Sequence, residues 1–301
     1  MEKGKAVFIL NPSSGKELAE TYRELCIRVL EEMGYSVEVR ATEKEGDATA
    51  FAREAARSGH PLVVAMGGDG TVNEAINGLA GEQDRPDFAL IPLGTVNDFA
   101  RALSIPLDPE DAIRGLPEFV ARPTDIGLAG DRYFMNILAV GSLAEGVMDV
   151  PVGEKTRFGP LAYAAHGLQT LLSDERNQFT ITHDGGKWTG QASLVLAALT
   201  NSVGGFEKMN AGARTDDGLL HLTVIKQVKL PGLLKMSASL LLGKLQDEGA
   251  VEKIRTTHAH IETDEPLSCN IDGDEGGNTP IAIKVLRRHL RILAPEPTEG
   301  E

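Results

Sequence analysis

Cysteine is scarce in this chain, with two residues, Cys26 and Cys269, among 301. Two cysteines so far apart provide neither a disulfide framework nor the paired spacing of a zinc site, and they suit a reducing compartment. Apolar runs of the roughly 18 residues that span a bilayer are also missing. The N-terminus has no apolar region followed by a small-residue cleavage site, so no secretory signal is expected. The sequence predicts a cytoplasmic protein.

Positive charge is in short supply as well. Lys and Arg number 30 against 44 Asp and Glu, which gives a formal net charge of −14. Nucleic acid and anionic membrane surfaces attract proteins through clustered Lys and Arg, so we expect no nucleic-acid partner. The two common nucleotide-binding signatures, GxxxxGK[ST] and GxGxxG, follow none of the strand-like runs. Any phosphate site must therefore use another design.

The N-terminal part of the sequence does contain an alternation of short apolar runs and helical patterns. This alternation is typical of a doubly wound α/β domain, in which right-handed crossovers produce a parallel sheet covered on both faces. Ligands of such sheets bind beyond the carboxyl ends of the strands. The expected strands are 5–10, 36–41, 62–66 and 88–92, and the expected helices are 18–33, 48–57, 72–79 and 98–103.

The pattern changes after about residue 122 to strand-like runs with few helices. We expect a mostly antiparallel, β-sandwich-like domain over residues 123–287, separated near residues 117–123 from an α/β domain over 1–122. The C-terminal segment 288–301 is a candidate to complete the α/β domain. The expected strands are 133–140, 178–183, 192–200, 219–226, 255–262, 267–271 and 281–286, and the expected helices are 161–172 and 230–242.

The stretch GGDGT, residues 67–71, stands between a buried strand and a helix. Its glycines can adopt positive φ and let a phosphate approach the backbone, and Thr71 can cap a helix whose N-terminal N–H groups point at the anion. Asp69 would repel a phosphate unless a divalent cation lay between them, so Asp69 predicts Mg²⁺ bound with a nucleotide. A plain tight turn with a capping residue is the alternative interpretation.

Two further polar turns follow other expected strands. NPSSG at 11–15 offers hydroxyl and backbone N–H groups, and GTVND at 94–98 adds Thr95 and a second carboxylate, Asp98. Each turn alone is an ordinary start of a helix. The fold would bring all three turns to one edge of the sheet, where together they predict a pocket for a polyphosphate.

These motifs are similar to those of the bacterial diacylglycerol-kinase-like lipid kinases, relatives of the eukaryotic diacylglycerol, sphingosine and ceramide kinases. The resemblance covers nearly the whole chain, although GGDGT alone is shared with NAD kinases and, in similar form, with phosphofructokinases. It implies a phosphofructokinase-like N-terminal domain, with ATP lying between that domain and the β domain. The matching motifs are NPSSG at 11–15, GGDGTVNE at 67–74, GTVNDFAR at 94–101, PTDIG at 123–127, ARTDDGLL at 213–220 and NIDGDEGG at 270–277.

The resemblance also implies how nucleotide and catalytic metal would be held. Asp69, Asp98 and Asp125 would form an acidic network that holds a catalytic Mg²⁺, directly or through water. The implied nucleotide contacts are Asn11, Pro12, Ser13, Ser14, Gly15, Thr42, Gly67, Gly68, Asp69, Gly70, Thr71, Val72, Asn73 and Thr95.

A second, structural Mg²⁺ is implied elsewhere. It would bind the carboxylate of Asp217 and the backbone carbonyls of Arg214 and Leu219. The residues alone permit another interpretation, because Asp-Asp-Gly at 216–218 between two strand-like runs is also a good hairpin turn.

The general base is where this chain departs from the family's usual Asp-Gly-Glu. Here the motif is Asp272-Gly273-Asp274, followed by Glu275. A carboxylate at 274 can accept the proton of a substrate hydroxyl, but it is one methylene shorter, and proton transfer depends on hydrogen-bond reach. Register in the motif favours Asp274, with Glu275 as the alternative. An acidic turn in a protein that has lost activity is a third interpretation.

Together these assignments predict an ATP-dependent lipid kinase of phospholipid metabolism that phosphorylates a lipid hydroxyl, most simply that of diacylglycerol. The alternatives are a kinase of a soluble acceptor, such as NAD or a sugar phosphate, and a catalytically silent nucleotide-binding protein. The apolar stretch 230–242 is too short to span a bilayer, but it can lie in the interface or pack on the β domain. We expect the lipid to be met at the inner face of the cell membrane. The oligomeric state stays open, with a homodimer among the alternatives.

Overall fold

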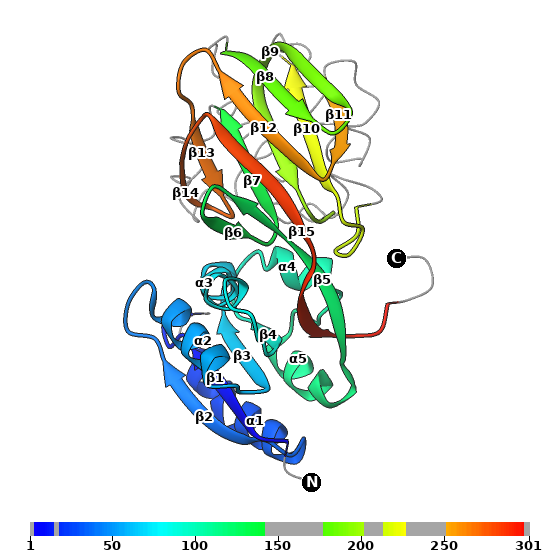
Figure 1. Ribbon diagram of the computed structural model, residues 1–301. Helices are drawn as coiled ribbons and strands as arrows, with labels where there is room; N and C mark the ends of the chain where they lie inside the picture. Colours follow the sequence, from blue (N-terminus) through cyan, green and yellow to red (C-terminus); the bar gives the residue numbers. More distant parts are fainter. Residues whose placement is uncertain (1–2, 15–17, 142–176, 202–212, 227–250, 298–301) are drawn as a thin grey trace, which may run out of the picture.

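The computed structural model describes residues 3–14, 18–141, 177–201, 213–226 and 251–297. Its strands belong to one hydrogen-bonded sheet of 15 strands. Figure 1 shows a lower part in which helices cover parallel strands and an upper part built mainly of antiparallel strands. The expected helices 161–172 and 230–242 lie outside the described residues, as does Gly15.

The lower part is the parallel sheet that the sequence predicts. Its strands are β1 (Lys5–Leu10), β2 (Ser36–Ala41), β3 (Leu62–Gly67) and β4 (Asp87–Pro92), and they lie in the order β2-β1-β3-β4. Every residue of β3 is buried, as expected for a continuous apolar run in a sheet covered on both faces. The chain steps outward from β1 to β2 and then returns across β1 to β3, so the switch point of the topology lies between β1 and β3.

Five α-helices follow these strands in the described part of the chain. They are α1 (Leu18–Glu32), α2 (Asp47–Arg57), α3 (Asp69–Ala80), α4 (Asp98–Ala102) and α5 (Pro109–Gly115), with a 3₁₀ turn, η1 (Leu116–Glu118), after α5. α1 packs against α5, and α2 packs against α3. In α2 the buried residues are alanines at helical spacing, which gives this helix an apolar stripe and allows close approach to α3. The doubly wound prediction is confirmed.

The upper part contains mostly antiparallel pairs. Alternate residues of β12 are buried, the pattern of a strand with one face on the core. Phe134, Phe179 and Val195 are among the residues of a second buried cluster, separate from that of the lower part. The strands are β6 (Arg132–Phe134), β7 (Ile137–Gly141), β8 (Asn177–His183), β9 (Gly186–Ala198), β10 (Leu220–Lys226), β11 (Val251–Thr256), β12 (His258–Thr263), β13 (Ser268–Ile271) and β14 (Asp274–Asn278).

Two of the expected strands are each divided in the structure. The run 133–140 becomes β6 and β7, and the run 255–262 becomes β11 and β12. At the first break, backbone N–H groups donate to Asp272. At the second break, Thr257 donates from its N–H and its hydroxyl to Asp184. At both breaks, backbone N–H groups donate to a side-chain carboxylate instead of to the carbonyl of a neighbouring strand, and the strand ends there.

Two long strands, β5 (Val120–Ala129) and β15 (Ile281–Ala294), belong to both parts (Figure 1). They pair with each other antiparallel, and β15 also pairs with β12 at one end and parallel with β4 at the other. A register shift between Leu286 and Leu290 marks a bulge, where Arg288 has a φ of 48°. Beyond the bulge, Leu290 and residues 292–294 join the buried cluster of the lower part, and Ile281 and Ile283 join that of the upper part.

This continuity differs from the sequence expectation in two ways. The segment 117–123, where a separation was expected, contains the end of η1 and the start of β5. The expected strand 281–286 runs on to Ala294. The prolines at the N-terminal side of β5 resemble a linker, but long-range pairing with β15 keeps this segment extended.

Candidate active site

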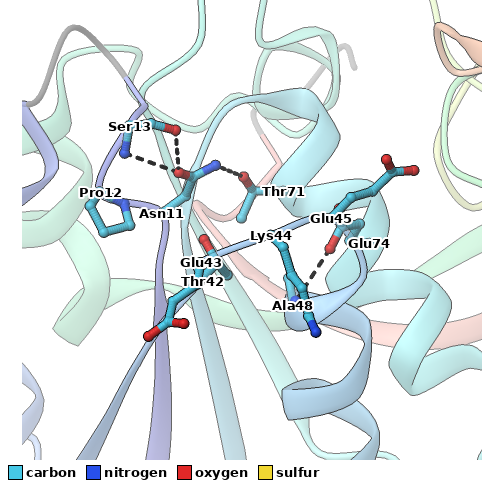
Figure 2. A pocket seen from close by; sticks show the side chains of 10 residues that line it. All are labelled: Asn11, Pro12, Ser13, Thr42, Glu43, Lys44, Glu45, Ala48, Thr71 and Glu74. Carbon is cyan, nitrogen blue, oxygen red and sulfur yellow. Dashed lines mark hydrogen bonds between the residues drawn. The ribbon is translucent and has the colours of Figure 1, made fainter.

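A pocket of about 310 Å³ lies at the carboxyl edge of the parallel strands (Figure 2). Its walls come from the turn after β1, the turn after β2, and the first turns of α2 and α3, so it sits at the switch point between β1 and β3. Its volume is at the lower end of the usual range for small-molecule sites. The lining residues are Asn11, Pro12, Ser13, Thr42, Glu43, Lys44, Glu45, Ala48, Thr71 and Glu74.

Asn11 shapes the first wall of the pocket. Its Oδ1 accepts hydrogen bonds from Ser13 N at 3.1 Å and Ser13 Oγ at 2.8 Å, which folds the NPSS turn back on itself. Its Nδ2 donates to Thr71 Oγ1 at 2.9 Å (Figure 2). One side chain therefore fixes the turn after β1 against the start of α3.

Helix α3 begins three residues earlier than a cap at Thr71 would require. Gly68 is its N-cap residue, and no side chain caps this end in the described structure. Thr71 lies inside the helix and accepts from Asn11 instead. The expected capping role of Thr71 is therefore wrong. A helix start whose N–H groups have no side-chain acceptor keeps them available for an anion.

We expected the glycines of this turn to adopt positive φ angles. None of Gly67, Gly68 and Gly70 does so. Instead they allow close packing. A Cβ on Gly67 would lie 2.6 Å from Thr71 Cβ, and a Cβ on Gly68 would lie 3.4 Å from the Cα of Gly94. Bare backbone thus brings the turn after β3 against the turn after β4. A Cβ on Gly70 would meet nothing within 4 Å, so this glycine faces open space.

Asp69 ties the two glycine turns together. Its Oδ2 accepts from Asn97 N at 2.9 Å. Asn97 has a φ of 54° and closes its own turn by two hydrogen bonds with the backbone of Gly94. Burial raises the pKa of Asp69 and the nearby charge of Asp98 raises it further, while backbone N–H groups act against the rise. The structure therefore brings Asp69 and Asp98 together at the carboxyl edge.

Asp125 is not part of this pair. Its Oδ2 accepts from Gly218 N at 2.6 Å, and its Oδ1 accepts from Arg288 N at 2.6 Å. Burial raises the pKa of Asp125, two backbone N–H groups oppose the rise, and the acidic neighbours that contribute to it are Asp217 and Asp216. The carboxylate of Asp125 thus fastens the bulge of β15 to the turn before β10.

The expected network of Asp69, Asp98 and Asp125 is consequently split between two places. Among the residues that the structure describes, no three Asp, Glu, His or Cys side chains form a group able to hold a metal ion. Both oxygens of Asp125 accept from backbone N–H groups, one from the turn before β10 and one from the bulge of β15. The three-aspartate network, in which water can bridge to the ion, stays a prediction.

The residues expected to hold a structural metal do lie together. Asp217 Oδ1 accepts from Leu219 N at 2.9 Å, and Oδ2 accepts from Arg214 N at 3.2 Å and lies 2.8 Å from His221 Nε2. Burial acts to raise the pKa of Asp217, but the pKa is lowered because His221 and the backbone N–H groups stabilise the carboxylate. These contacts are those of a hydrogen-bonded turn, the alternative that the sequence left open.

Asp272 and Gly273 form a two-residue turn between β13 and β14. Their φ values are 50° and 103°, the doubly positive pattern of the type I′ turns that Asp-Gly favours. Asp274 follows as the first residue of β14, exposed and 3.5 Å from Arg132 in an ion pair. Arg132 also donates to the backbone carbonyl of Glu275. Asp274 and Glu275 point to opposite faces of the strand, so a cleft on one face can use only one of them.

Comparison with known proteins identifies the family. The family model "Diacylglycerol kinase catalytic domain" matches residues 5–129, and "YegS C-terminal NAD kinase beta sandwich-like domain" matches residues 140–294. A diacylglycerol kinase of Bacillus subtilis (strain 168) is 37% identical over 295 residues, which cover 97% of each chain. The chain belongs to the bacterial diacylglycerol kinase family.

Two other relatives agree with this kinase assignment. A diacylglycerol kinase of Staphylococcus aureus (strain Newman) is 36% identical over 99% of this chain and 94% of its own length. A crystal structure of a diacylglycerol kinase from Bacillus anthracis str. Sterne superposes with a TM-score of 0.82 at 28% identity, covering 97% of both chains. The protein is therefore a kinase, with an N-terminal α/β catalytic part and a β-sandwich-like C-terminal part. None of its described helices has the length and apolar character to cross a membrane.

The structure distributes the expected nucleotide contacts of this kinase unevenly. Asn11, Pro12, Ser13, Thr42 and Thr71 line the pocket. Val72 is buried, and Thr95 is exposed. Ser14 donates its N–H to the carbonyl of Asn11 in the turn after β1. Asn73 is buried, and its side chain donates to Asp272 in the C-terminal part of the sequence.

Several lining residues of the kinase pocket were missed. Glu43, Lys44 and Glu45 follow β2 and reach the same edge as the other turns. Glu74 projects from α3, and its Oε2 accepts from Gly46 N at 3.0 Å and Ala48 N at 3.2 Å, so it occupies the N-terminus of α2. The signal available in the sequence was the charged run TEKEGD directly after the strand 36–41.

Proposed function

We propose that this kinase transfers the γ-phosphoryl group of ATP to the hydroxyl of diacylglycerol, which gives phosphatidic acid. One observation carries the proposal: in a chain of this family, the pocket at the switch point is bordered by the free start of α3 and by the turns after β1 and β2. The relatives named diacylglycerol kinase support the choice of lipid.

The start of α3 is suited to the phosphates of ATP. Its N–H groups carry the positive end of the helix dipole, and Gly70 leaves open space beside them. Lys44 adds a positive charge to the wall of the pocket. Phosphoryl transfer asks a protein mainly for positioning and for stabilisation of charge on the transferred group. The helix start supplies positioning, whereas the phosphate charge must be balanced largely by a divalent ion, because Glu43, Glu45 and Glu74 outnumber Lys44 in the wall.

Asp69 and Asp98 fit a Mg²⁺ that binds with the nucleotide. The pKa of Asp69 is raised by burial and in part by the negative charge of Asp98, so a cation at this edge would favour the ionised form of Asp69. Mg²⁺ sites in kinases commonly use one or two carboxylates, with phosphates and water supplying the remaining oxygens. The ion would neutralise phosphate charge during transfer. We assign Asp69 and Asp98, without Asp125, as its protein ligands.

A structural Mg²⁺ at Asp217 fits less well. Both carboxylate oxygens already interact with the turn 214–219 or with His221. Binding an ion there, with the carbonyls of Arg214 and Leu219, would require some of these hydrogen bonds to rearrange. We propose that this second site binds Mg²⁺ only if the hydrogen bonds of Asp217 rearrange.

Asp274 is our proposed general base. It lies at the start of β14, one residue after the turn that contacts α3, and it accepts the proton of the lipid hydroxyl as the γ-phosphoryl group is transferred. Glu275 is the alternative base on the other face of the strand. Lipid substrate would be met at the membrane surface, where the hydroxyl of diacylglycerol is presented.

A second candidate function is phosphorylation of a soluble acceptor such as NAD. It is favoured by the C-terminal family match, which is described as NAD kinase β-sandwich-like. A lipid needs an apolar groove beside Asp274, whereas NAD or a sugar phosphate needs polar or cationic side chains. The two functions therefore differ in the acceptor and share the ATP site.

The test is transfer of label from [γ-³²P]ATP with Mg²⁺ to diacylglycerol in mixed micelles, to NAD, and to a sugar phosphate. We expect phosphatidic acid as the main product and a loss of about 10³-fold in kcat for Asp69→Ala, the size typical of removing a group that stabilises transition-state charge. Arg114→Ala, an exposed change in α5, is the matched control and should retain full activity. Labelled NADP without labelled lipid would replace the proposal by its alternative, and no transfer to any acceptor would refute both.

A further inference from the structure

The turn residue Asp272 makes more contacts than its turn requires. Its Oδ1 accepts from Asn136 N at 3.0 Å and Ile137 N at 2.8 Å, and its Oδ2 accepts from Met135 N at 2.7 Å and Asn73 Nδ2 at 2.7 Å. An Asp-Gly type I′ turn forms from local backbone preference and needs none of these partners. The carboxylate therefore serves a contact between distant segments.

Asn73 belongs to α3, the helix whose first turn borders the proposed phosphate site. One helical turn further along, Asn77 Nδ2 donates to Asn73 Oδ1 and to Tyr133 O, each at 3.0 Å, and Asn77 Oδ1 accepts from Tyr133 N at 3.0 Å. In Figure 1, α3 lies directly below β6, and the two elements are in contact. Two asparagines thus fasten one face of α3 to β6 and to Asp272.

The electrostatics show that this arrangement is costly. Burial raises the pKa of Asp272 to about 6, even though four N–H groups donate to its carboxylate. All of its hydrogen-bond partners in the described chain are neutral. Beside it, the side-chain oxygen of Asn136 is buried and accepts no hydrogen bond from the described residues. Buried polar atoms without a hydrogen-bond partner are uncommon in folded proteins, so the oxygen of Asn136 calls for an explanation other than packing.

We propose that Asp272 is a positioning residue for phosphoryl transfer, whose carboxylate joins the turn before Asp274 to Asn73 and so fixes Asp274 relative to the nucleotide held at the start of α3. The inference rests on the proposed function, because it takes Asp274 as the base and α3 as the phosphate-binding helix. Asp272 contacts neither reactant. It acts through Asp274.

Asp272→Asn is the most direct test. The substitution keeps the shape of the side chain but replaces one acceptor oxygen by an NH₂ group that faces two N–H donors. We expect kcat for lipid phosphorylation to fall about 100-fold, the loss associated with a displacement of about 1 Å in a reacting group. The Kd for ATP, measured by titration calorimetry, should stay within about threefold, because the start of α3 is untouched.

The same substitution in an Asp274→Ala background separates positioning from a general loss of structure. If Asp272 acts through Asp274, the double variant should have a kcat within about threefold of Asp274→Ala alone, because groups that act as a unit are not additive. Losses that multiply in the double variant would overturn the inference. A folded Asp272→Asn variant with kcat near wild type would overturn it as well, while leaving the proposed function standing. Full activity of Asp274→Ala would instead refute the proposed base, and the inference with it.

Asn77→Ala provides a second route if Asp272→Asn does not fold. It removes the support of Asn73 and leaves the carboxylate with its three backbone donors. We expect about a tenfold loss in kcat, with the Kd for ATP unchanged. Asn278→Ala, an exposed change at the far end of the same hairpin, is the matched control and should behave as wild type. An Asn77→Ala variant with the kcat of this control would contradict the proposal.

Discussion

The parallel and the antiparallel parts of the molecule contribute to the site in different ways. The parallel part offers backbone: three turns after β1, β3 and β4 reach one edge, and glycines allow two of them to touch. The antiparallel part offers single carboxylates, Asp272 and Asp274, on a hairpin whose anchor is on α3. The position of a backbone turn follows from the direction of the strand before it. The position of the carboxylates instead depends on a contact between residues 199 apart in the sequence, Asn73 and Asp272. The turns of the site can therefore be predicted from the sequence, whereas the contacts of the carboxylates cannot.

The largest effect that would sharpen this comparison is expected in the glycine turn. Gly67→Ala would place a Cβ 2.6 Å from Thr71 Cβ, so the turn must move. We expect the free energy of unfolding to fall by about 1–3 kcal/mol, the usual cost of overpacking. Urea denaturation measures the change.

Gly70→Ala is the matched control for that substitution. Its Cβ would meet nothing within 4 Å, and alanine is the better helix former at this position of α3. We expect stability at or slightly above that of the wild type, together with weaker ATP binding by roughly tenfold, since the methyl group occupies the space beside the helix start. Equal ATP affinity for Gly70→Ala and wild type would argue that the phosphates lie elsewhere.

An effect of similar size is expected for Asp125→Asn. The amide would place an NH₂ group against the N–H of Gly218 or of Arg288, and an unsatisfied buried donor costs about 1–3 kcal/mol. The dependence of activity on Mg²⁺ concentration should be unchanged, because we do not assign Asp125 as a ligand of the ion. A shift of the Mg²⁺ midpoint in this variant, measured by activity titration, would restore the three-aspartate network expected from the sequence.

The smallest effect concerns the ionisation of Asp272. Its pKa in the folded protein is raised by burial from 3.8 to about 6, so the native state binds this proton more tightly than the unfolded state does. The contribution of Asp272 to stability is therefore greatest below pH 3.8 and is lost as the pH rises through 6. Carboxyl ¹³C NMR, with Asp272→Asn to assign the signal, should give a midpoint near 6. A midpoint below 4 would mean that the hydrogen bonds to the carboxylate outweigh its burial, which would contradict this prediction.

Much of the parallel part could be predicted from the sequence. The apolar runs that became β1 to β4 are short and bounded by polar turns, so strand positions and the edge that carries the site follow from chain direction alone. The turn at 67–71 was recognised, but the reason for its glycines was not. Their role is the approach of Gly94 and Thr71 to the backbone, which depends on how two turns meet in space.

The antiparallel part was harder to predict, because its key contacts join residues that are far apart in the sequence. Arg288 interrupts the alternation of β15, so a continuous strand could not be recognised beyond residue 286. Asp125 carries no local sign that Gly218 and Arg288 will donate to it. Asp272 was read only as part of a turn, because Asn73 and the backbone of 135–137 are brought to it by folding. Long-range hydrogen bonds leave no periodic trace in a sequence.

The central claim is that the parallel part holds ATP while Asp274 of the antiparallel part activates the lipid hydroxyl. The most direct measurement is kcat for phosphatidic acid formation by Asp274→Ala and Glu275→Ala, with ATP affinity measured on the same samples. We predict a loss of about 10³-fold for Asp274→Ala, full activity within about threefold for Glu275→Ala, and unchanged ATP affinity in both. Loss of activity in Glu275→Ala with Asp274→Ala active, or loss of ATP binding in Asp274→Ala, would contradict the account.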